Sequence, residues 1–251
     1  MSEAPLILAC DTTQGACSVA LYQDGVLGTA LQSMRQGHAE ALLPMMAELM
    51  AAQNLPMQAV GRLAVTHGPG TFTGVRVGLS AMRGLALALN VPLVCYGTLQ
   101  VMALAAAHDG PLIVAVDARR ATFYAQAFDA ARHPLGVPQA LSAEDTLALA
   151  ADFDPADQIA LVGSGAALLA PLASEQAAPT GRNFVETDAP HWPQAHILAR
   201  LAAEDTAWQA RAEQPAEPLY LRPPDAKLPN RAKFPARASS KPAGSPNGDS
   251  A

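Results

Sequence analysis

The sequence predicts an α/β protein built from two lobes of like topology. Half of its 251 residues are hydrophobic and 15% are charged, which gives enough apolar surface for one large domain or two modest lobes. An apolar run that ends in aspartate, Leu6–Asp11, recurs without gaps as Leu112–Asp117, and a strand followed by glycines recurs as well. Because order and spacing repeat as well as composition, we favour a duplication, although any two buried strands that end in Asp would look alike.

A three-stranded meander opens the first half. The run 6–10 leads into a polar turn, residues 17–22 alternate, and Asp24-Gly25 marks a hairpin into a strand at 26–31. A helix is expected over 38–53, where Pro44 lies in the first turns or kinks it, because an interior proline costs about 3 kcal/mol. A strand at 63–66, a helix to about Leu89, a strand at 91–96 and a helix at 98–107 follow.

The second half repeats this plan. A strand at 112–117 pairs with one at 122–128, a capping box of Ser142 and Asp145 begins a helix to about 153, and a strand at 159–162 and a helix at 194–208 follow. We therefore expect an amino-terminal lobe at 1–108, a carboxyl-terminal lobe at 109–221 and a proline-rich basic tail at 222–251. From about residue 235 the tail is expected to be disordered.

Charge and cysteine content restrict the classes of function. The tail holds six Lys or Arg against two Asp, a net charge of +4. Because the whole chain has a net charge of −6, residues 1–221 carry −6 − 4 = −10. An acidic body without a single lysine is a poor free-standing nucleic-acid binder. Three cysteines without a CxxC pair and an amino terminus unlike a secretion signal predict a cytoplasmic protein. No segment is predicted to span a membrane, since Arg76, Arg83, glycine and proline interrupt the apolar stretches.

A polar turn and a second aspartate form a candidate cofactor site. Asp11, with Thr12 and Thr13 after it, stands where two-lobed kinases and ATPases place a metal-facing carboxylate and a phosphate-contacting turn. Asp117 is the counterpart across the expected cleft. Many strands end in an Asp that only caps a turn, and taken alone the turn favours that structural explanation.

The glycine-rich segment 68–74 is a second part of this candidate site. Backbone amides before a helix amino terminus can bind an anion, and the candidates are Gly68, Gly70, Thr71 and Thr73. The segment lacks the P-loop lysine and the GxGxxG spacing. A structural turn that needs glycine explains the composition equally well.

Catalytic and metal-ligating groups are not evident. No two of the six histidines have the three- or four-residue spacing of a helical metal pair, and Gly163-Ser164-Gly165 is no nucleophile elbow. We expect no catalytic residue and no metal site.

The helices at 38–53 and 75–89 are apolar around most of their circumference, which is typical of helices sandwiched in a domain or shared with a partner. We expect a subunit interface, adaptable because of its methionines. Arg76 and Arg83, seven residues apart, either meet an anion or acidic partner or form the solvated side. The candidate interface residues are Leu42, Met45, Met46, Leu49, Val75, Arg76, Leu79, Met82 and Arg83.

Several motifs carry a family resemblance. The most specific is Gly68-Pro69-Gly70-Thr71-Phe72-Thr73-Gly74-Val75-Arg76-Val77-Gly78, supported by Ile7-Leu8-Ala9-Cys10-Asp11-Thr12-Thr13, His38-Ala39-Glu40 and Pro218-Leu219-Tyr220-Leu221-Arg222. Over residues 6 to about 229 the sequence resembles the bacterial TsaB (YeaZ) family of the tRNA threonylcarbamoyladenosine machinery.

The resemblance implies a duplicated, two-lobed actin-like ATPase (ASKHA) fold. It implies a non-catalytic relative of the catalytic subunit TsaD, whose metal-binding His-x-x-x-His pair is missing from the corresponding stretch 96–103. It also implies a TsaD-like partner and a homodimer, both through the two amino-terminal helices, and a TsaE-like ATPase as a further partner. Contact with tRNA is implied only through the complex, and ATP or ADP only at that level, with no cofactor of the chain's own.

Two other functions are considered. A small-molecule kinase or ATPase of the actin-like fold would use Asp11, Thr12, Thr13 and Asp117 in the cleft. A metalloprotease follows only from how distant relatives have been labelled, and no metal-ligand set supports it.

Overall fold

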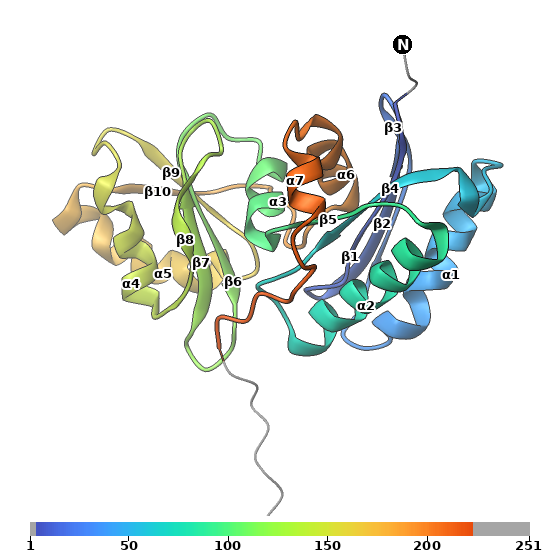
Figure 1. Ribbon diagram of the computed structural model, residues 1–251. Coiled ribbons are helices and arrows are strands. Elements are labelled where there is room, and N and C mark those ends of the chain that lie inside the picture. Colours follow the sequence, from blue (N-terminus) through green and yellow to red (C-terminus); the bar gives the residue numbers. More distant parts are fainter. Residues whose placement is uncertain (1–3, 223–251) are drawn as a thin grey trace, which may run out of the picture.

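The computed structural model describes residues 4–222, apart from the side chains of 177–180, so the predicted disorder from about residue 235 lies outside the described residues. Two five-stranded sheets stand side by side, with helices on their outer faces and between them (Figure 1). The first half contains β1 (Leu6–Asp11), β2 (Ala16–Tyr22), β3 (Val26–Ser33), α1 (His38–Ala52), η1 (Met57–Ala59), β4 (Val60–Thr66), α2 (Phe72–Leu89), β5 (Leu93–Tyr96) and α3 (Thr98–Ala105).

The second half contains the same series of strands and helices, followed by one additional helix, α7. Its elements are β6 (Leu112–Asp117), β7 (Phe123–Phe128), β8 (Pro134–Leu141), α4 (Ala143–Ala148), η2 (Leu149–Asp152), β9 (Gln158–Val162), α5 (Ala166–Thr180), β10 (Asn183–Glu186), α6 (Ala195–Glu204) and α7 (Trp208–Ala212).

The two sheets have the same topology. The strand orders are β3-β2-β1-β4-β5 and β8-β7-β6-β9-β10. In each sheet the first three strands are antiparallel and the last two run parallel to the central strand. The predicted duplication is confirmed, and β1 and β6, whose sequences repeat, are the central strands of the two copies.

Each half of the chain contributes one helix to the core of the other half. Alternate residues of β1 face opposite ways, so Leu8 packs toward α1 and α2 while Ile7 packs toward α6. Helix α6, from the second copy, covers the inner face of the first sheet. Helix α3, from the first copy, covers the inner face of the second sheet through Leu99 and Met102. Each continuous half of the chain therefore completes the core of the other.

One predicted helix is shorter in the structure. The helix expected over 194–208 ends at Glu204, Asp205 is extended, and a separate helix, α7, begins at Trp208. The Asp205 carboxylate accepts hydrogen bonds from the Ala207 amide at 2.9 Å and from the Tyr96 hydroxyl at 2.8 Å. The bond to the Ala207 amide is a local side-chain turn, which competes with continuation of α6.

Candidate functional site

The Asp11 carboxylate at the end of β1 is buried and used inside the protein. Its Oδ2 accepts hydrogen bonds from the hydroxyls of Thr13, at 2.8 Å, and Thr66, and its Oδ1 accepts one from the Thr13 amide at 3.2 Å. Burial raises the pKa of Asp11 to about 6, against the opposing effect of these hydrogen bonds. Asp11 is 1% exposed, which agrees with the structural explanation of this turn: the carboxylate ties the ends of β1 and β4 together.

The predicted phosphate-contacting turn is covered by the glycine-rich loop. The Thr12 hydroxyl donates to the Gly74 carbonyl at 2.7 Å, and the Thr71 amide donates to the Thr13 carbonyl at 2.8 Å. A Cβ at Gly74 would lie 2.0 Å from the Thr12 carbonyl oxygen, and one at Gly70 would lie 2.4 Å from that of Thr13. The loop needs glycine for this close approach. Thr12 and Thr13 are buried, and their prediction as cofactor contacts is corrected to a structural role.

The other predicted cofactor residues divide between interior and surface. Gly68 is buried at a φ of +112°, where an added Cβ would lie 2.7 Å from the Leu219 carbonyl oxygen. Gly70, Thr71, Thr73 and Asp117 line a cavity of about 280 Å³ between the lobes. Asp117 is exposed there, and its Oδ1 accepts the Arg119 amide at 2.7 Å. The cavity brings together four of the eight predicted residues.

The lining of this cavity limits its chemistry. Among the described residues that line it, Asp117 is the single carboxylate, and the remaining polar side chains are those of Gln14, Thr71, Thr73, Tyr124, Tyr220 and the arginines 119 and 222. Within residues 4–222 no three His, Cys, Asp or Glu side chains gather in a way that could hold a metal ion. The described residues that line this cavity thus present neither an activated nucleophile nor a paired acid and base.

Seven of the nine predicted interface residues belong to the chain's own core. They pack between α1, α2 and the first sheet, so their prediction as partner contacts is corrected. Both α1 and α2 are apolar on two sides, and the side that carries these seven residues packs against the first sheet. The seven are Leu42, Met45, Met46, Leu49, Val75, Leu79 and Met82.

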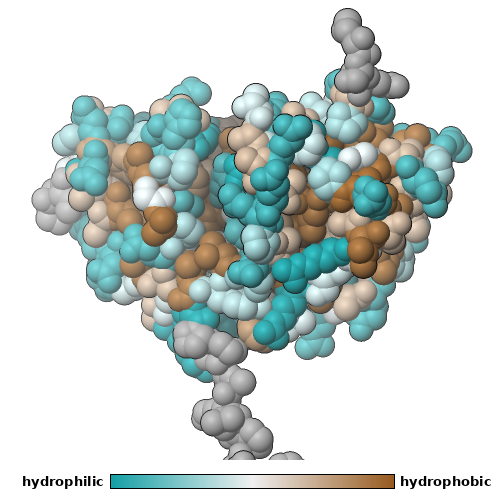
Figure 2. Space-filling view, viewed as in Figure 1, coloured by the Kyte–Doolittle hydropathy of each residue, from teal (hydrophilic) through white to brown (hydrophobic). Residues whose placement is uncertain are grey.

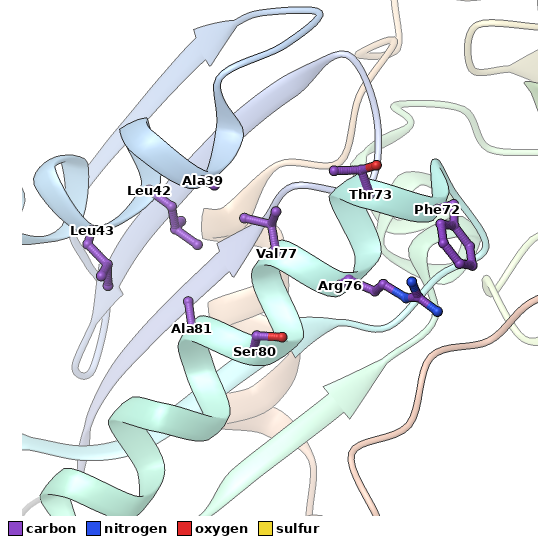
Figure 3. A pocket seen from close by; sticks show the side chains of 9 residues that line it. All are labelled: Ala39, Leu42, Leu43, Phe72, Thr73, Arg76, Val77, Ser80 and Ala81. Carbon is purple, nitrogen blue, oxygen red and sulfur yellow. The ribbon is translucent and has the colours of Figure 1, made fainter. Parts of the chain in front are cut away.

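The outer sides of the same helices form an apolar groove. It has a volume of about 470 Å³ and lies between α1 and α2, with Leu43 on one wall and Val77 and Ala81 on the other (Figure 3). Leu43 is 50% exposed, and Leu87, further along α2, is 85% exposed. In Figure 2 apolar side chains show among polar ones over this part of the molecule. The sequence contained the signal for Leu43 in the broad apolar surface of its helix, which is wider than one sheet can cover.

The two predicted interface arginines are exposed but held by other parts of the chain. The Arg76 guanidinium lies 3.6 Å from the centre of the Phe72 ring, and its Nε donates to the Tyr220 hydroxyl at 2.8 Å. Arg83 donates to the carbonyl of Ala216. These contacts with the carboxyl-terminal segment have no local signal in the sequence, because the partners lie more than 130 residues apart.

The length and apolar composition of α2 must be compared with the expectation that no segment spans a membrane. By length and composition alone it is apolar enough to cross a membrane, although it carries Arg76 and Arg83. A helix that packs in a protein core satisfies the same criteria, and α2 packs Val75, Leu79 and Met82 against the first sheet. This property does not indicate a membrane protein.

Comparisons with known proteins agree with this architecture. Residues 26–228 match a protein-family model described as "TsaD: tRNA N6-adenosine threonylcarbamoyltransferase". The chain is 36% identical over 121 residues to the tRNA threonylcarbamoyladenosine biosynthesis protein TsaB of Escherichia coli K12. This match covers 47% of the chain and 52% of the relative, so the chain spans about half the length of that curated protein.

Two solved structures extend the match. YeaZ from Pseudomonas aeruginosa is 30% identical, with a TM-score of 0.70 over 86% of this chain and 100% of that one. Component A of (R)-2-hydroxyglutaryl-CoA dehydratase from Acidaminococcus fermentans has a TM-score of 0.50 at 9% identity, over 80% of this chain and 98% of that one, which shows a shared fold alone. With the duplicated topology, these likenesses confirm the predicted two-lobed actin-like fold. The chain belongs to the TsaD family of threonylcarbamoyltransferase-like proteins and, within it, to the TsaB (YeaZ) branch.

Proposed function

We propose that this protein is a non-catalytic scaffold subunit for threonylcarbamoyl transfer to the adenosine beside the anticodon of tRNA. The printed name of its E. coli relative, a tRNA threonylcarbamoyladenosine biosynthesis protein, supports this role. The match to the TsaD-type family model supports an origin by loss of catalytic groups from an enzyme of that family.

The buried turn at Asp11 supports a non-catalytic role. Both oxygens of that carboxylate accept hydrogen bonds from the protein itself, and the glycine loop packs against Thr12 and Thr13. The stretch Tyr96–Ala103 offers no His-x-x-x-His pair. The catalytic subunit of the family supplies the chemistry in this proposal, and ATP or ADP acts only at the level of the complex.

The exposed apolar groove between α1 and α2 is the observation that carries the proposal. Leu43, on the wall of this groove, is a large apolar side chain left half in water, as at many protein interfaces. We propose that a TsaD-like catalytic subunit occupies this groove and that a second copy of the chain occupies it when the chain is alone. A TsaE-like ATPase is the further partner in the cytoplasm.

The charge of the chain supports indirect contact with tRNA. Residues 1–221 contain no lysine and are strongly acidic, so phosphate neutralisation falls to the catalytic subunit in this proposal. The alternatives of a small-molecule kinase, an ATPase or a metalloprotease have no support from the described residues, whose candidate metal-facing carboxylate is buried.

Binding of the purified chain to its TsaD-like partner tests the proposed face. Leu43→Arg places a charge in the groove and should weaken binding on the order of tenfold or more, since each tenfold is about 1.4 kcal/mol. Val137→Arg is the matched control, because Val137 is a 72% exposed apolar residue on β8 of the other lobe. Equal affinity of wild type and Leu43→Arg would reject the α1–α2 groove as the docking face.

A further inference from the structure

The segment after α7, residues 213–222, crosses from one lobe to the other (Figure 1). We call it the C-terminal strap. It first runs along the end of β4, where the Leu219 amide donates to the His67 carbonyl at 2.8 Å. His67 Nδ1 lies 3.1 Å from the Glu217 carbonyl oxygen and therefore donates to it, since a carbonyl only accepts. These two bonds anchor the strap to the first sheet.

The strap then meets the exposed beginning of α2. Tyr220 packs against Phe72 with ring centres 5.1 Å apart, and its hydroxyl accepts the hydrogen bond from Arg76. The Arg76 guanidinium lies over both rings, at 3.6 Å and 5.7 Å. About two turns further along α2, Arg83 donates to the Ala216 carbonyl. Two cations of α2 thus bind the strap to the first lobe from outside.

The strap ends on the second lobe. Arg222 donates to the Ala118 carbonyl at 3.1 Å, in the turn between β6 and β7. The next residues, Arg119, Arg120 and Ala121, have φ values of 64°, 55° and 53°, a conformation that costs non-glycine residues energy and persists where surrounding contacts hold it. The Arg222 bond is one such contact.

The position of these contacts suggests a mechanical role. The lobes also meet through α3 and α6, which pack against each other between the sheets. The strap joins the lobes at the cavity that Tyr220 and Arg222 help to line. Two-lobed proteins with one packed hinge region commonly open and close around it. A segment bonded to both lobes beside this cavity, as the C-terminal strap is, would restrict that motion.

We propose that the C-terminal strap is a latch that holds the two lobes at one angle. Its contact with Arg76 fixes it to the first lobe, and the hydrogen bond from Arg222 to the Ala118 carbonyl fixes it to the second. The latch acts within a single chain and does not depend on the proposed partner. Because Arg76 also lines the α1–α2 groove, a partner bound in the groove would contact the same arginine that holds the strap on the first lobe.

The distance between the lobes tests the latch. Spin labels at Ala52→Cys and Ala148→Cys, exposed positions on α1 and α4, report that distance in the full chain. All labelled variants also carry Cys95→Ser, which removes the partly exposed native cysteine; Cys10 and Cys17 are buried and are kept. We expect a narrow distance distribution with the native strap and a roughly twofold broader one with Arg222→Ala. Arg35→Ala, an exposed arginine in the loop before α1, is the matched control and should leave the distribution unchanged.

Amide hydrogen exchange provides a second measurement without labels. Arg222→Ala should speed exchange of the Ala118 and Thr122 amides, which bond within the β6–β7 turn, while amides of β1 stay protected. Tyr220→Phe, which keeps the ring contact and removes the hydroxyl, should broaden the distance distribution less than Arg222→Ala. An unchanged distribution and unchanged exchange in Arg222→Ala would overturn the latch, whatever the outcome of the partner-binding experiment.

Discussion

The buried carboxylate of Asp11 predicts a specific dependence of stability on pH. Burial raises its pKa to about 6 in the folded protein from the ordinary value of 3.8. The protonated form is therefore favoured by folding, so the stabilisation is fully present below the unfolded pKa and is lost as the pH rises through 6. With about 1.4 kcal/mol for each pH unit, the full effect is about 3 kcal/mol.

Asp11→Asn isolates this effect, because the variant lacks the titrating group while other groups titrate equally in both proteins. Between pH 4.5 and pH 7.5 the free energy of unfolding of the wild type should fall by about 2 kcal/mol relative to the variant, since part of the effect lies below pH 4.5. Urea unfolding followed by far-ultraviolet circular dichroism measures both proteins at each pH. A constant difference between the two across this range would refute the interpretation of Asp11 as a desolvated structural carboxylate.

Two further pairs of substitutions test the packing of the glycine-rich loop and the orientation of α2. Gly74→Ala should destabilise the protein by about 2 kcal/mol or more in the same urea assay, because its Cβ would lie 2.0 Å from the Thr12 carbonyl oxygen. Gly84→Ala, on the same helix with nothing within 4 Å, should instead gain about 0.5–1 kcal/mol, and similar losses in both would contradict the close approach of the loop. Leu79→Arg should lower the melting temperature strongly, because Leu79 is buried in the core, whereas Leu87→Arg should leave it nearly unchanged. Equal melting temperatures for these two variants would contradict the assigned orientation of α2.

Much of the fold was predictable from the sequence because its duplication is visible there. The apolar runs of β1 and β6 and the glycine steps after β4 and β9 repeat in order. Strand β8 was missed because Pro134 and Pro138 interrupt its alternation, which an edge strand tolerates. Helix α5 and strand β10 were missed as well, although α2 and β5, their counterparts in the first half, were predicted.

The candidate site was predictable in composition but not in orientation. The sequence places apolar residues on two sides of α1, and only the packing decides that Met46 faces the sheet while Leu43 faces outward. In the same way, a strand that ends in Asp11 can present its carboxylate to a ligand or to Thr66. Contacts between distant segments, such as that of Arg76 with Tyr220, decide such cases and leave no local pattern.

The non-catalytic scaffold role is tested most directly by the rate of threonylcarbamoyl transfer to tRNA by the reconstituted complex, measured as a function of the concentration of this chain. We expect Leu43→Arg to raise the concentration needed for half-maximal rate by about tenfold and to reach the wild-type plateau. Asp117→Asn should match the wild type in both respects. A lower plateau with Asp117→Asn at unchanged affinity would place part of the chemistry in this chain and contradict its role as a non-catalytic scaffold.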